Sequence, residues 1–158
     1  MSRITLRPMA IALPCATVGA ALVVTPTAAA TPTDPIQLAA CDFGRQLTTF
    51  DWAGYDDYDR RVLDLSTGAF HDQFSATAPD RRAQATSGHT RSEAMSVECR
   101  TDVPDPEHPQ IVVTVDQSTR SDATLGLPRP QRSVMRVYLD NVDGRWLTER
   151  VDMLPPPA

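Results

Sequence analysis

Two cysteines, Cys41 and Cys99, are the residues of the 158-residue chain with the most distinctive chemistry. Outside the cytoplasm such a pair tends to oxidise to a disulfide. Helical geometry argues against it, because Cys41 lies five residues after Ile36, or about 140° around a helix from the apolar stripe that Ile36 begins. Its thiol should therefore point partly away from a sheet beneath that stripe. The pair is either a disulfide or two buried thiols.

The three histidines, His71, His89 and His108, are scattered along the chain. No pair of histidines or cysteines has the spacing of a zinc site. The chain also has no Ser-His-Asp elbow, phosphate-binding glycine loop or dinucleotide fingerprint. The sequence therefore predicts neither a metal nor a cofactor.

Glu149 and His71 are the two candidates for acid–base chemistry. If Leu147, Val151 and Met153 face the core of a strand, Glu149 faces it too, and burial would raise the pKa of its carboxyl group. A β-bulge would instead turn Glu149 outward. For His71, an exposed position on a helix is the favoured interpretation.

The charge of the chain excludes one class of function. The formal net charge is −5, and the few basic residues near the N-terminus leave the remainder more acidic still. An acidic domain offers no electrostatic surface for nucleic acid and little attraction to anionic lipid.

The first thirty residues have the order of an export segment: two arginines, an apolar run over 9–24, and small residues at Ala28 and Ala30. The run is shorter than the roughly 20 residues of a membrane span, and Pro14 interrupts it, which favours cleavage before Thr31 over an uncleaved anchor. We therefore predict a signal peptide or N-terminal membrane anchor at 1–30, a short linker at 31–34, a single domain at 35–154 and a Pro-rich tail at 155–158.

Three helices are predicted at the start of this domain. Asp34 can cap the first, with Pro35 at its first position. Apolar residues then recur at helical spacing along one stripe: Ile36, Ala39, Ala40, Phe43, Leu47 and Phe50. Two shorter helices follow at Tyr55–Leu65 and Ala69–Ala78, and Pro79 is expected to interrupt or end the last of them.

Four strands are predicted in the second half, where the hydrophobic period becomes two. They are Glu93–Thr101, Ile111–Gln117, Ser133–Asn141 and Arg145–Met153. Met95, Val97 and Cys99 should share the core-facing side of the first, and Asp143-Gly144 is a hairpin signal. Helices followed by sequential strands indicate an α+β domain, in which the N-terminal helices pack on one face of a four-stranded antiparallel sheet. Between the first helix and the sheet, a candidate pocket would be lined by Phe43, Leu47 and Glu149.

Several short motifs occur in a suggestive order. They are Thr48-Thr49-Phe50-Asp51, Leu63-Asp64-Leu65-Ser66-Thr67-Gly68, Val115-Asp116-Gln117 and Asp143-Gly144-Arg145-Trp146. In order and spacing, over roughly residues 40–154, the chain resembles the Mce-associated (membrane) proteins of actinobacteria.

This resemblance implies a curved cystatin-like, or nuclear-transport-factor-2-like (NTF2-like), cone. It also implies a non-catalytic accessory or scaffolding role beside Mce-type lipid or sterol import complexes, with envelope proteins as partners and no nucleic acid. The expected location is outside the cytoplasm, either secreted or anchored at the outer face of the cytoplasmic membrane. Two alternatives remain: a module that binds a small hydrophobic ligand, and an enzyme resembling ketosteroid isomerase with Glu149 or His71 as base.

Overall fold

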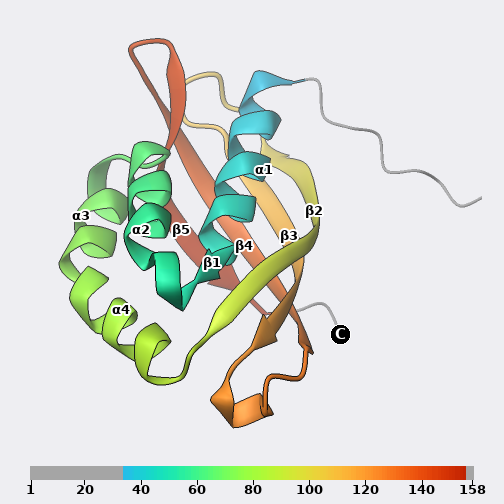
Figure 1. The fold of residues 1–158 in the computed structure, drawn as a ribbon. Coiled ribbons are helices and arrows are strands. Elements are labelled where there is room, and N and C mark those ends of the chain that lie inside the picture. Colours follow the sequence, from blue (N-terminus) through green and yellow to red (C-terminus); the bar gives the residue numbers. More distant parts are fainter. Residues whose placement is uncertain (1–33, 156–158) are drawn as a thin grey trace, which may run out of the picture.

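The computed structural model describes residues 34–155. The predicted export segment, nearly all of the linker and most of the tail lie outside these residues. The elements are α1 (Pro35–Thr48), β1 (Phe50–Asp51), the 3-10 turn η1 (Trp52–Gly54), α2 (Tyr55–Asp64), α3 (Gly68–Ala76), α4 (Ala78–Ser87), β2 (Arg91–Val103), β3 (Gln110–Arg120), the 3-10 turn η2 (Asp122–Thr124), β4 (Arg129–Val142) and β5 (Arg145–Leu154). The predicted α+β class is confirmed: the helices pack against a curled antiparallel sheet (Figure 1).

The sheet is a meander in the strand order β1-β2-β3-β4-β5, with every neighbouring pair antiparallel. The four predicted strands are β2 to β5, and the sequence did not predict the two-residue edge strand β1. It forms where the chain leaves α1, and Phe50 there pairs with Ser92 at the beginning of β2. The predicted turn at Asp143-Gly144 joins β4 to β5, and both residues have the positive φ that a tight hairpin needs.

Helix α1 packs directly on the strands. The Asp34 side chain accepts a hydrogen bond from the Ile36 amide at 2.9 Å and so caps the helix. Phe43 and Gly44 lie on the buried face of this helix. A Cβ atom added to Gly44 would lie only 2.6 Å from Cγ1 of Val113. The helix backbone therefore rests on β3 with no space between them.

Helix α3 ends at Ala76, close to the predicted end at Ala78, but Pro79 does not end the helical region. Pro79 lies in the first turn of α4, where a proline's missing amide would have no helical partner in any case. The helix then runs to Ser87, over residues for which no helix was predicted.

Two irregularities in the strand register decide the direction of two side chains: Met95 was wrongly predicted to face the core, and for Glu149 the bulge alternative is the one observed. Between β2 and β3 the register shifts at Met95, which is 66% exposed and not in the core. Between β4 and β5, Tyr138 pairs with Arg150 and Leu139 with Thr148, which leaves Glu149 as the extra residue of a bulge. Because a bulge reverses the alternation of side chains, Thr148 is buried and Glu149 is exposed.

The core lies between the helices and the inner face of the sheet. Its strand contribution alternates along β3 and β4: Ile111, Val113, Val115, Met135, Val137 and Leu139. The outer face carries cross-strand ion pairs, of which Arg132–Asp116 (2.6 Å) and Arg136–Asp102 (2.9 Å) are two. The hydrogen bonds from Arg132 lower the pKa of the Asp116 carboxyl group.

Candidate functional site

Cys41 and Cys99 are joined by a disulfide that ties α1 to β2, with 5.8 Å between their Cα atoms. The expectation that the Cys41 thiol points partly away from the sheet is wrong, because α1 lies across β2 as well as β3. The helix face that meets β2 includes Gln37, whose amide donates to the Thr101 hydroxyl at 2.8 Å. Cys41 lies one turn along this same face.

The three residues of the predicted pocket do not meet in one cavity. Phe43 is 1% exposed, and its ring packs edge-on against Phe70 with 5.2 Å between centroids. Leu47 is half-buried at the edge of the same core. Glu149 is exposed on its bulge, where its Cγ lies 2.9 Å from the position of a Cβ on Gly68.

The histidines lie apart. His71 is 3.6 Å from Asp72, and its side chain is 43% exposed. His89 occupies the turn before β2, where its Nδ1 lies 2.7 Å from Asp122 and its ring meets Trp52 edge-on. The sequence offered no signal for the His89–Asp122 pair, because its members are brought together only by the packing of two turns. Within residues 34–155 no group of three or more potential ligands could hold a metal.

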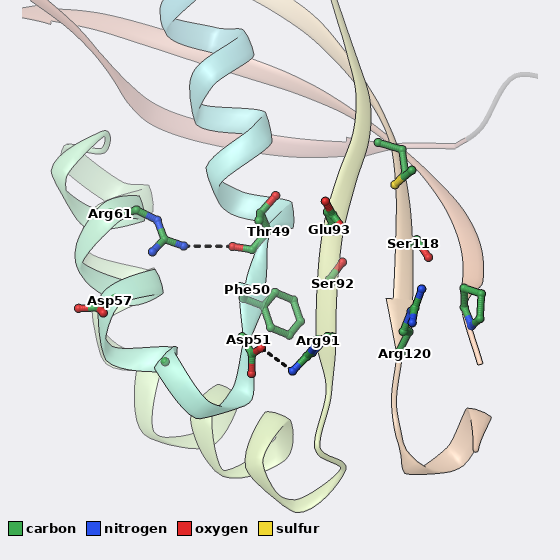
Figure 2. Close-up of a pocket in the computed structure, with 13 residues that line it drawn as sticks. Thr49, Phe50, Asp51, Asp57, Arg61, Arg91, Ser92, Glu93, Ser118 and Arg120 are labelled. Atoms are coloured by element: carbon green, nitrogen blue, oxygen red, sulfur yellow. Dashed lines mark hydrogen bonds and ion pairs between the residues drawn. The ribbon is translucent and has the colours of Figure 1, made fainter. Parts of the chain in front are cut away.

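Within residues 34–155, a surface groove of about 650 Å³ is a candidate site. Its lining comes from β1, from the first residues of β2, from the end of β3, from α2 and from Pro128 before β4. Figure 2 shows Arg61 reaching from α2 toward Thr49, Asp57 on the outer side of the same helix, and Ser92 and Glu93 on β2. Each wall is thus provided by a different part of the fold.

The β1 side of the groove is firmly held. Asp51 caps η1 by accepting from the Ala53 amide at 3.0 Å, and it pairs with Arg91 at 2.9 Å. Arg61 donates to the Thr49 carbonyl at 3.3 Å (Figure 2). Phe50 packs against Tyr58 with 5.3 Å between ring centroids, and burial raises the pKa of the Tyr58 hydroxyl. These contacts fix the shape of this wall.

The groove carries charges of both signs. Asp51, Asp57 and Glu93 lie among three arginines, Arg61, Arg91 and Arg120. Because the two signs balance, the groove as a whole should not attract a simple ion of either sign. Arg91 and Arg120 are directly opposite each other in the strand register, a placement that costs stability when it is uncompensated. Asp51 compensates one of them.

This groove suits recognition of a polar or mixed-charge surface better than covalent or acid–base chemistry. It is shallow and open, with Met95 and Pro128 as apolar contacts among charged side chains. Sequence reasoning did not identify it as a site. The available signal was the Thr48-Thr49-Phe50-Asp51 motif, since three of its four residues line the groove.

Comparison with known proteins gives the fold. No family model and no curated protein matches the chain in sequence. In structure it is similar to an Ntf2-like protein involved in plasmid conjugation (TM-score 0.56, 12% identity, 77% of this chain), and it spans about half, 48%, of that protein's length. It is also similar to CagV, a VirB8 homologue of the type IV secretion system from Helicobacter pylori (TM-score 0.59, 12% identity, 77% of this chain and 98% of that one).

The chain has an NTF2-like fold. A ketosteroid isomerase-like protein from Erwinia carotovora atroseptica shares it as well, with a TM-score of 0.51 and 14% identity over 77% of this chain and 95% of that one. Because proteins with very different roles share this fold, the fold does not by itself define a function. None of the helices within residues 34–155 is long and apolar enough to cross a membrane.

Proposed function

We propose that this protein is a non-catalytic accessory or scaffolding protein of the bacterial cell envelope. It is exported by its first thirty residues, and 35–154 is its one working domain. The system that it serves is an Mce-type lipid or sterol import complex. The order of motifs shared with the Mce-associated proteins supports the last point. The likeness to a protein of the type IV secretion system is compatible with an accessory role in the envelope.

The packing of Gly44 on Val113 carries the choice of a scaffolding protein over a binder of a small hydrophobic ligand. The space between α1 and the sheet is filled, since even one added methyl group would lie 2.6 Å from a valine methyl. A small hydrophobic ligand between the helix and the sheet, the first alternative, would have to displace this packing. Such displacement is costly in a close-packed interior.

The enzyme alternative required a buried acid or base, and neither candidate residue is buried. Glu149 is exposed on a bulge, and the side chain of His71 is 43% exposed. Neither lies in a water-excluded cavity that would tune it as a general base. The open groove, by contrast, gives a scaffolding protein a shaped surface for a partner.

The Cys41–Cys99 disulfide supports a location outside the cytoplasm. Such bonds persist in oxidising compartments and are rare where thiols are kept reduced. Together with the basic, apolar and small-residue order of the first thirty residues, it favours an exported protein. Residence at the outer face of the membrane or release from it are both compatible with this proposal.

Affinity purification from an actinobacterial host with an Mce operon tests the proposal. We expect the tagged chain in the envelope fraction, together with Mce-type subunits. Glu93→Arg, in the groove, should reduce their recovery, whereas Glu107→Arg, in the exposed loop between β2 and β3, should not. Deletion of the gene without any effect on Mce assembly or lipid uptake would contradict the proposal, as would a cytosolic location.

A further inference from the structure

Strand β2 has a long unpaired edge. On one side it pairs with β3 along most of its length, and on the other it pairs with β1 only at Arg91 and Ser92. From Glu93 to Val103 no other strand among residues 34–155 pairs with this second side. An open edge of this kind presents backbone groups that can pair with another chain.

The middle of this edge is regular and stiff. The register with β3 shifts at Met95 and again between Thr101 and Val103, and between these points it runs without interruption. The Cys41–Cys99 disulfide ties the centre of this run to α1, and Gln37 donates to Thr101 further along it. A strand held in this way loses little conformational freedom when it pairs.

The charges on the run are complementary to themselves. Glu98 and Arg100 flank Cys99, and both are exposed on the outer face of the sheet. Neither forms an ion pair within the described part of the chain, whereas Asp102 and Asp116 on this face are paired with arginines. If the strand met a copy of itself in antiparallel orientation with the two Cys99 residues opposite, Glu98 of each copy would face Arg100 of the other. Opposite charges placed in this way stabilise a strand pair.

We propose that two copies of this protein associate through the β2 edges, antiparallel and centred on Cys99, to form one continuous sheet across a two-fold axis. The symmetry makes the contact isologous, so it closes at two copies. The two-fold axis is perpendicular to the sheet, which places both α1 helices on the same side.

Charge reversal tests the register. Sedimentation equilibrium of the chain purified from an exporting host, with its disulfide intact, should give a dimer at micromolar concentrations. Glu98→Arg and Arg100→Glu should each raise the dimer dissociation constant by roughly ten-fold or more, because like charges would then face each other twice. The double variant should restore the wild-type value, and Glu107→Arg should leave it unchanged.

Hydrogen–deuterium exchange provides a second readout. The amides of 96–101 should become more protected as the protein concentration rises, while those of β5 should not change. A wild-type protein that stays monomeric up to about 100 µM would overturn the proposal. So would a dimer that tolerates both single reversals, or one protected elsewhere. These outcomes leave the proposed envelope role untouched, since that role does not require a dimer.

Discussion

At the scale of single residues, Gly44 shows how one position can decide whether a fold has an interior pocket. Its missing side chain allows the backbone of α1 to rest on Val113. A larger residue here would have to lift the helix or bend the strand. The closed interior, and with it the argument against a buried ligand, depends on this contact.

We therefore predict that Gly44→Ala destabilises the protein despite the better helix propensity of alanine. Overpacking of this kind costs about 1–3 kcal/mol. Gly54→Ala is the matched control, because a Cβ there meets nothing within 4 Å and its φ of −119° is open to any residue. Its effect should be within about 0.5 kcal/mol. Urea unfolding measures both, and equal stabilities for the two variants would show that α1 does not rest on β3.

Two residues limit what could be predicted from the sequence at this scale. Met95 and Glu149 fit the alternation of their strands, but each lies at a bulge that reverses its direction. A bulge depends on how two strands curl around the core, and no local pattern in this chain marks it. The sequence therefore left Glu149 as either a buried candidate base or an exposed residue of a bulge, and the structure decides for the bulge.

At the scale of elements, the periodic patterns predicted α1 to α3 and β2 to β5. The missed elements, β1 and α4, have physical causes. Strand β1 is only two residues long and exists because β2 passes beside it. Helix α4 contains Pro79, which was interpreted as an end although it lies in a first turn.

Helices α2 and α4 are held together by a largely buried charge cluster. Asp59, with its side chain only 8% exposed, accepts from Arg81 at 3.0 Å and from Arg82 at 3.2 Å. Arg81 also lies over the Phe74 ring, 3.5 Å from its centroid. Loss of the carboxylate would leave the partly buried Arg81 without its counter-charge.

We predict that Asp59→Ala destabilises the protein by about 2–3 kcal/mol, less than a fully buried pair would because Arg82 remains near solvent. Asp56→Ala removes another carboxylate that pairs with Arg82 from the same helix, but Asp56 is 75% exposed. Its effect should be below about 1 kcal/mol. Thermal unfolding of the two variants makes the comparison, and an equal loss in both would mean that the cluster does not hold α2 to α4.

The disulfide links two elements that are far apart in sequence, with a separation of 58 residues. Closing a loop of this length stabilises by about 4 kcal/mol on the chain-entropy model. We expect the double variant Cys41→Ser/Cys99→Ser to lose much of this stability, and Cys15→Ser, in the proposed export segment, to lose none. Denaturant unfolding in an oxidising buffer measures the free energy of unfolding of each variant. Equal midpoints for the double variant and the wild type would show that the bond does not constrain the unfolded chain.

At the scale of the whole molecule, the chain is a closed helix-on-sheet body with an open groove and an open edge. The class of this body follows from the order of its periodic segments. The groove does not, because β1, α2, β3 and Pro128 meet there only after the sheet has curled. The motif around Phe50 is the one sequence feature that points to the groove. The cysteine pair is a separate feature, and it bears on the proposed location of the protein.

Peptide mapping of the chain isolated from the envelope fraction, alkylated without reductant, tests the central claim that an exported body is fastened by a bond from α1 to β2. We predict that the peptides containing Cys41 and Cys99 are recovered joined, with neither sulfur alkylated. Recovery of both peptides separately with alkylated thiols, or of the protein only from the cytosol, would contradict the account.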